Sequence, residues 1–291
     1  MAKYLNPKND LTFKRIFGEH PELLLNFLNA IMPFEEGRYI EELHYLSAEQ
    51  VPDNPGKKNS IVDVKCIDNY KRQFIVEMQM LWDESFFNRV VFNASKAYVK
   101  QLNKSEDYDL LQPVYNLALV NENYDKKTNN FYHYYQIVNV ANTDETIDGL
   151  QFVLVELLKF KPKTWADKKL AVLWLRFLNE VNEDLKELPK ELLENEYIGK
   201  AAELCERAAF TPEELEKYEA YWDMIRVEKS IRAGALRKGE KIGIKKGEKI
   251  GIEKGKAEEK LEIAKKLLNA NIPINIIIES TGLTKEELEN L

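Results

Sequence analysis

Residues 60–80, SIVDVKCIDNYKRQFIVEMQM, predict two β-strands that are joined by a short polar turn. The first strand covers residues 60–67 and is rich in β-branched side chains. Asp68 and Asn69 provide the turn, and residues 73–80 form the returning strand. The segment is therefore expected to form an antiparallel β-hairpin.

Alternation along the two strands places carboxylates on one face of this hairpin. The face expected to be apolar in the first strand carries Val62, Val64 and Cys66, and the opposite face carries Ile61, Asp63 and Lys65. If residue 67 pairs with residue 73, Asp63 lies directly opposite Glu77, at a Cβ separation of about 4.5–5.5 Å. Gln79 points to the same side as Glu77, so three polar side chains gather there.

Two facing carboxylates repel each other unless a cation lies between them. Mg²⁺ binds carboxylate oxygens and retains several waters, which suits the hydrolysis of phosphodiesters. Gln79 could orient a water or donate to a phosphate oxygen, but a neutral amide is neither a cation nor a strong base. The spacing alone also fits an ordinary hairpin whose outer face is polar.

The flanking segments predict an α+β (α/β) body over residues 1–160 and a helical region over residues 161–235. Asn9 is a plausible N-cap for a helix or helix pair that ends near residue 32. Apolar residues at helical spacing predict a further helix over residues 83–104. Three more strands are expected at residues 114–120, 131–140 and 150–158.

The last part of the chain, residues 236–291, contains a repeat in which glycine recurs every four residues from Gly239 to Gly255. This spacing fits a helix with a spiralling smooth stripe, but each glycine costs about 1 kcal/mol relative to alanine. A partner-dependent helix and a mobile linker therefore both remain open. The final 26 residues predict a small acidic helical unit, which resembles a helix-turn-helix fragment but offers few cations to phosphates.

Composition excludes several classes of protein. The chain has 291 residues and a net charge of −7, and its two cysteines cannot form a disulfide scaffold or a cysteine-based zinc finger. Residues 226–266 are basic, with 14 Lys and Arg against 7 Asp and Glu. No apolar run is long enough for a membrane span, and the first residues lack the features of a secretory signal. The expected compartment is the cytoplasm.

Other side chains could serve a nucleic-acid site. Arg89 and Lys96 lie on the helix after the hairpin and could contact phosphates, although a solvated helix face or a salt bridge explains them equally well. His133 could be a general base, but the surrounding Tyr132, Tyr134 and Tyr135 fit better with a strand that packs in a sheet.

Several of these motifs, taken in order, resemble the recombination-promoting nuclease/transposase family of the PD-(D/E)xK nuclease superfamily. The resemblance spans roughly residues 5–160 and, more loosely, the C-terminal region. The segments that carry it are NDLTFKRIFG at 9–18, SIVDVKC at 60–66, RQFIVEMQ at 72–79, FFNRVVFNASKAYVKQL at 86–102, LQPVYNLALV at 111–120 and the glycine-repeat tail.

The resemblance implies a restriction-endonuclease-like core, with a mixed central sheet flanked by helices and a helical C-terminal region. It also implies a bacterial DNA endonuclease that uses Mg²⁺ (or Mn²⁺) and is linked to recombination or mobile elements. Asp63 and Glu77 would hold the metal, Asp10 would be an accessory acid, and Gln79 stands where many relatives have lysine. Because that lysine is missing, the alternative is a catalytically weakened DNA-binding or protein-interaction module. The C-terminal helical region could also support a homo-oligomer.

Overall fold

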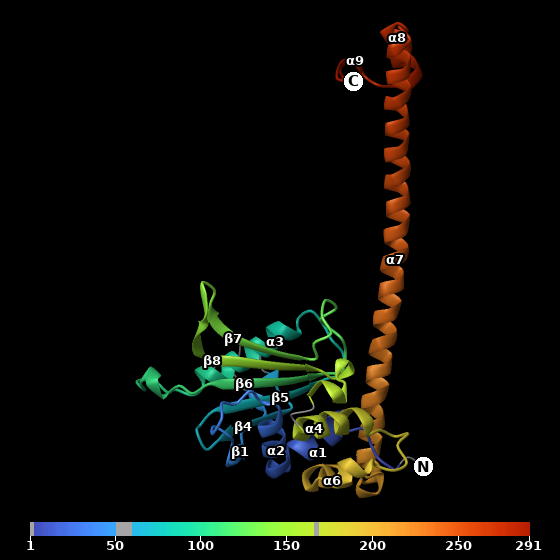
Figure 1. Ribbon diagram of the computed structural model, residues 1–291. Helices are drawn as coiled ribbons and strands as arrows, with labels where there is room; N and C mark the ends of the chain where they lie inside the picture. Colours follow the sequence, from blue (N-terminus) through green and yellow to red (C-terminus); the bar gives the residue numbers. More distant parts are fainter. Residues whose placement is uncertain (1–2, 51–59, 166–168) are drawn as a thin grey trace. The chain divides into compact units, whose positions relative to one another are not determined.

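The structure is a computed structural model that describes residues 3–50, 60–165 and 169–291. The chain divides into two compact units, Met1–Ile225 and Arg226–Leu291. In the first unit a mixed sheet lies between layers of helices (Figure 1). This arrangement confirms the predicted α/β fold of the restriction-endonuclease-like type.

The main sheet has six strands in the order β1-β4-β5-β6-β8-β7. Its neighbours β5, β6 and β8 run parallel, and all other pairs in it are antiparallel. A separate two-stranded sheet pairs β2 with β3. The strands are β1 (Leu43–Tyr45), β2 (Glu49–Gln50), β3 (Ser60–Ile61), β4 (Val64–Asp68), β5 (Gln73–Gln79), β6 (Val114–Val120), β7 (Tyr132–Asn139) and β8 (Asn142–Glu156).

The helices lie before, between and after these strands. The α-helices are α1 (Asp10–Phe17), α2 (Pro21–Ile31), α3 (Phe86–Val99), α4 (Lys169–Glu180), α5 (Lys190–Leu193), α6 (Glu196–Glu203), α7 (Pro212–Asn269), α8 (Ile274–Thr281) and α9 (Lys285–Glu289). Short 3₁₀ turns occur at Tyr108–Leu110, Leu157–Lys159, Pro162–Trp165 and Arg207–Ala209.

The hairpin of β4 and β5 has the predicted register. Ile67 pairs with Gln73, and the ladder continues as far as Val64 opposite Val76. The next pair in this register would join the two carboxylates of the predicted metal site. The ladder ends at Val64 and Val76, but the same register places Asp63 next to Glu77.

The first predicted strand is interrupted by a bend at Asp63, between the end of β3 at Ile61 and the start of β4. The bend breaks the alternation of faces, because Val62 packs with Ile75 beside α3 while Val64 joins the core on the opposite face. The prediction of one continuous strand with Val62 and Val64 on the same face is therefore wrong at Val62. The interruption releases Asp63 from backbone pairing.

The two faces of the sheet are covered by different helices (Figure 1). Helix α3 joins β5 to the parallel strand β6 and packs its apolar side, including Val90 and Ala94, against one face. The opposite face contributes Phe74 and Cys66 to the main core, which also contains the apolar residues of α1, α2, α4 and α6. Polar residues on the α3 face are thus enclosed between sheet and helix.

The N-terminal segment is tied to residues from the end of the first unit. The side chain of Asn9 caps α1 by accepting a hydrogen bond from the backbone N–H of Leu11 (3.0 Å), as predicted. The same side chain donates to the carbonyl oxygen of Tyr218 (3.2 Å), and Leu5 N donates to the carbonyl oxygen of Cys205 (2.8 Å). These bonds fix the position of α1 and of Asp10 at its start.

The second unit contains the C-terminal part of α7 together with α8 and α9. The glycine-repeat segment is helical and forms part of α7. Gly282 ends α8 in the left-handed region (φ +68°), and Thr284 and Glu287 form a capping box on α9. The homo-oligomer expected through this region stays a prediction.

No helix among the described residues is long and apolar enough to cross a membrane.

Candidate active site

Carboxylates from three separate segments meet beside the end of β5. Asp63 lies at the bend before β4, and its Oδ2 accepts a hydrogen bond from the backbone N–H of Met78 (2.7 Å). Glu77 is the preceding residue on β5, and its charge acts directly on Asp63. The charge of Asp10, at the start of α1, also acts on Asp63. The structure therefore brings together Asp10, Asp63 and Glu77, the three acids predicted from the sequence to belong to the site.

The environment of Asp63 favours its neutral form. The pKa of Asp63 is raised to about 6, chiefly by burial and also by the charges of Glu77 and Asp10, against the opposing effects of the Met78 N–H and of Lys14. The ammonium of Lys14 is already 2.8 Å from Asp10. In the described part of the chain no lysine or arginine forms an ion pair with Asp63, so its negative charge is poorly compensated.

Glu77 is held between the sheet and α3 and is 7% exposed. Burial raises its pKa, while the Asn93 side chain, which donates to Glu77 Oε1 (3.2 Å), and the charge of Arg89 lower it. The Asn116 amide, from β6, also lowers this pKa, although neither its nitrogen nor its oxygen has hydrogen-bond geometry with any described residue. The site thus contains buried polar atoms whose bonding capacity is unused.

Gln79 is neutral, but its side chain contacts the cation Arg89. Arg89 Nη2 donates to Gln79 Oε1 (2.5 Å), and Gln79 Nε2 donates to the carbonyl oxygen of Leu81. The guanidinium of Arg89 also lies 4.0 Å from Asp83 and packs over the ring of Phe86. Arg89 therefore places a positive charge beside Gln79.

A hollow of about 480 Å³ adjoins these residues along α3. Its lining combines polar side chains with an exposed phenylalanine and isoleucine; it consists of Ser60, Ile61, Ser85, Asn88, Arg89, Phe92 and Asn93. Lys96 lies two helical turns beyond Arg89, where its ammonium bonds the carbonyl oxygen of Gln50 and the hydroxyl of Ser60 (3.1 Å for the latter). Lys96 is thus on the same side of α3 but outside the carboxylate group.

Tyr221, near the start of α7, is a neighbour of the site that sequence analysis misses. Burial raises the pKa of its hydroxyl, and the charges of Asp10 and Asp63 also raise it. Its apolar surroundings include Met80 and Leu81. No local pattern identifies this residue, because it is more than 140 positions away from β5.

A second acidic group was also not predicted. Carboxylate oxygens of Asp125 and Glu156 and a ring nitrogen of His133 lie within 4.8 Å of one another and could hold a metal ion. However, the ammonium of Lys159 is 2.8 Å from Glu156, and His133 Nε2 is 2.9 Å from the same carboxylate. Glu156 therefore already has an ion-pair partner, whereas Asp63 and Glu77 have none among the described residues.

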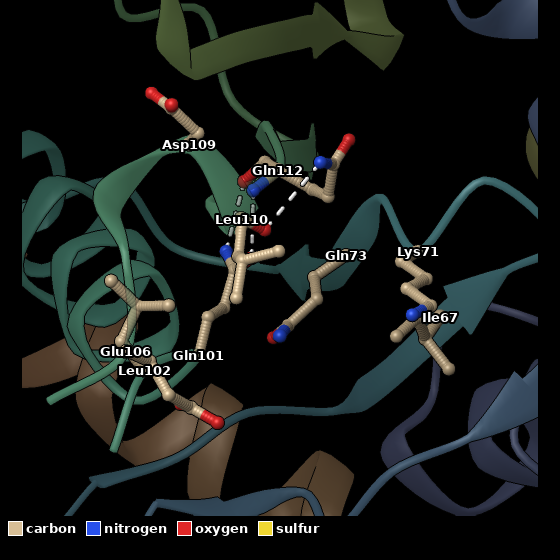
Figure 2. A pocket seen from close by; sticks show the side chains of 9 residues that line it. All are labelled: Ile67, Lys71, Gln73, Gln101, Leu102, Glu106, Asp109, Leu110 and Gln112. Atoms are coloured by element: carbon tan, nitrogen blue, oxygen red, sulfur yellow. Dashed lines mark hydrogen bonds between the residues drawn. The ribbon is translucent and has the colours of Figure 1, made fainter. Parts of the chain in front are cut away.

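Another hollow, of about 330 Å³, lies at the opposite end of β5 (Figure 2). Gln73 points into it, and Gln101 and Gln112 are hydrogen-bonded to each other at its wall. None of the acids predicted from the sequence lines this hollow. It is separate from the carboxylate site.

The fold and the site together define a class of protein. A mixed sheet with helices on both faces and carboxylates on adjacent segments of a hairpin is the arrangement of PD-(D/E)xK nucleases. The chain belongs to the PD-(D/E)XK nuclease family transposases, because the model of that family matches residues 7–231. Membership supports a nuclease or transposase-related role, and nucleases of this kind generally use divalent metals.

Comparisons with the curated proteins and with the solved structures give no match.

Proposed function

We propose that the protein is a divalent-metal-dependent DNA endonuclease that acts in bacterial recombination or on mobile elements. The observation that carries this proposal is the pair of carboxylates formed by the half-buried Asp63 and the buried Glu77. The pKa values of both are raised, and neither has an ion-pair partner among the described residues. When no cation is bound, two such carboxylates make folding less favourable. They are, however, a suitable ligand set for Mg²⁺ or Mn²⁺.

In this proposal each residue has a role that follows from its contacts. Asp63 and Glu77 hold the ion, which when bound polarises the phosphate and promotes deprotonation of water. The Met78 N–H orients Asp63, and the Asn93 amide orients Glu77. Gln79 orients water or phosphate, and Asp10 is an accessory acid. Because the donor set is made of carboxylate and amide oxygens, it fits a hard divalent ion.

The first test is the cleavage of supercoiled plasmid DNA by the purified full-length chain, with Mg²⁺ or with EDTA. We expect nicking or linearisation with Mg²⁺ and none with EDTA. Binding of DNA without cleavage under both conditions would instead support the weakened binding module, which the missing lysine at position 79 motivates.

Arg89 provides a second test. Its guanidinium contacts Gln79, the residue that stands in place of the lysine implied by the resemblance. Arg89→Gln should lower the rate of Mg²⁺-dependent cleavage by about a hundredfold, since removing a preorganised group that stabilises developing charge typically has an effect of that size. Arg89→Lys should retain more activity than Arg89→Gln. Equal rates in wild type and Arg89→Gln would show that the positive charge beside Gln79 has no part in the reaction.

A further inference from the structure

The hollow along α3 adjoins the carboxylate site through two of its lining residues. Asn93, which is buried at its inner wall, donates to Glu77 Oε1 (3.2 Å), and Arg89 donates to Gln79 Oε1 (2.5 Å). Its volume of about 480 Å³ lies within the range of about 300–1,000 Å³ that is usual for small-ligand pockets. A phosphodiester held by Asp63 and Glu77 would therefore have its neighbouring nucleotide at this hollow.

Two exposed apolar side chains line this hollow, although it lies beside charged groups. Phe92, on α3, is 42% exposed, and Ile61, at the end of β3, is 70% exposed. They come from different elements and line the same cavity, so they differ from apolar residues that are scattered singly over a surface. A cavity that combines them with polar side chains suits a ligand with an apolar face and a polar edge.

The ring of Phe92 is held in place by Lys96. The ammonium of Lys96 lies over the ring, 5.3 Å from its centroid, and bonds the hydroxyl of Ser60 (3.1 Å) and the carbonyl oxygen of Gln50. Lys96 thereby links the ring to the small sheet of β2 and β3, while the ring stays exposed to the hollow. A ring that is fixed and exposed is a suitable platform for stacking, because little conformational freedom is lost when a second ring binds.

Asn88 supplies a polar group beside this ring. It precedes Phe92 by four residues, so the two side chains lie on the same side of α3, and it is exposed. Its amide offers donors and an acceptor, and it forms no hydrogen bond within the part of the chain that the structure describes. A nucleobase has the matching chemistry, since it has flat π faces and an edge of donors and acceptors.

We propose that this hollow binds an unpaired nucleobase beside the scissile phosphate, with the base stacked on Phe92 and its edge hydrogen-bonded to Asn88. The inference rests on the proposed function, because it places the base next to the phosphate that the carboxylate site would hold. Bases in an intact duplex stack on one another and cannot reach a side chain in a cavity, so only a single-stranded or flipped nucleotide fits. The preferred substrate is therefore DNA that contains unpaired nucleotides.

The test is the binding of a short fluorescent DNA single strand, and of the paired duplex of the same sequence, measured by anisotropy in EDTA. Phe92→Ala should weaken binding of the single strand about tenfold, because the stacking of one base contributes on that scale, and should leave binding of the duplex unchanged. Phe92→Trp should bind the single strand as the wild type does, and Asn88→Ala should show a smaller loss than Phe92→Ala. The matched control is Tyr108→Ala, which removes a ring that is 84% exposed and does not line the hollow, and which should bind both DNAs normally.

Phe92 is exposed and lies outside the buried clusters of the described residues, so Phe92→Ala leaves no cavity in the core. Equal binding of the single strand by wild type and Phe92→Ala would overturn the inference, as would an equal loss for single strand and duplex or an equal loss in the control. Cleavage assays separate this inference from the proposed function. Binding of the single strand through Phe92 in a chain that never cleaves DNA would support the base site and contradict the nuclease. Metal-dependent cleavage of paired and unpaired DNA at equal rates, unchanged in Phe92→Ala, would do the opposite.

Discussion

Asp63→Ala is expected to abolish metal-dependent DNA cleavage while leaving the fold intact. The variant removes one of two carboxylates that would hold the ion, and the loss in rate should be at least about a thousandfold because the ion supplies most of the charge stabilisation. Asp63 lies at a bend and not in the hydrophobic core, so its removal leaves no apolar cavity. Plasmid cleavage measures the rate, and circular dichroism checks the fold.

The matched control for this experiment is Asp125→Ala. Asp125 belongs to the other group of side chains with metal-binding geometry, and it lies outside the carboxylates that meet beside β5. Cleavage should persist in this variant. Full activity in Asp63→Ala would contradict the assigned site, and loss of activity only in Asp125→Ala would move the metal to the group around Glu156.

Asp63→Asn is expected to stabilise the metal-free protein at neutral pH. The folded-state pKa of Asp63 is about 6, against an ordinary value of 3.8 for an aspartate side chain. The folded protein therefore keeps this proton over a range in which the unfolded chain has released it. Ionisation of Asp63 then makes folding less favourable as the pH rises from about 4 to about 6, by about 3 kcal/mol in total.

The asparagine variant lacks this loss because its side chain does not ionise, while its oxygen can still accept the Met78 N–H. Urea unfolding of both proteins in EDTA should give curves that diverge across this pH range, with the variant more stable above it. Excess Mg²⁺ should stabilise the wild type at neutral pH and have a smaller effect on the variant, because binding to the folded state adds to its stability. Parallel stability curves in EDTA would show that Asp63 has an ordinary pKa.

The hairpin is the part of the molecule that could be predicted most fully from the sequence. Alternation and the turn at Asp68 and Asn69 predict the register, and Ile67 does pair with Gln73. The same reasoning fails at Val62, because period-two alternation assumes a continuous strand and gives no sign of the bend at Asp63. On the N-terminal side of the bend, β3 pairs with β2 in a separate two-stranded sheet, which the sequence does not reveal.

The partners of the carboxylates could not be predicted, because they come from distant elements. Asn93 and Arg89 have helical spacing, but only the packing of α3 on the sheet places them over Glu77 and Gln79. Tyr221 reaches the site because α1 and the start of α7 are packed together, as the hydrogen bond from Asn9 to Tyr218 shows. Sequence patterns describe the faces of elements and not which faces meet.

The attachment of the N-terminal segment to the end of the first unit determines when, during synthesis, that segment can form its native hydrogen bonds. Leu5 and Asn9 are made first, but their hydrogen-bond partners at Cys205 and Tyr218 are made some 200 residues later. A growing chain that still lacks those residues also lacks the two hydrogen bonds that tie the segment around Asp10 to the end of the first unit. Almost the whole first unit is therefore synthesised before these hydrogen bonds, and the placement of Asp10 that they support, can be completed.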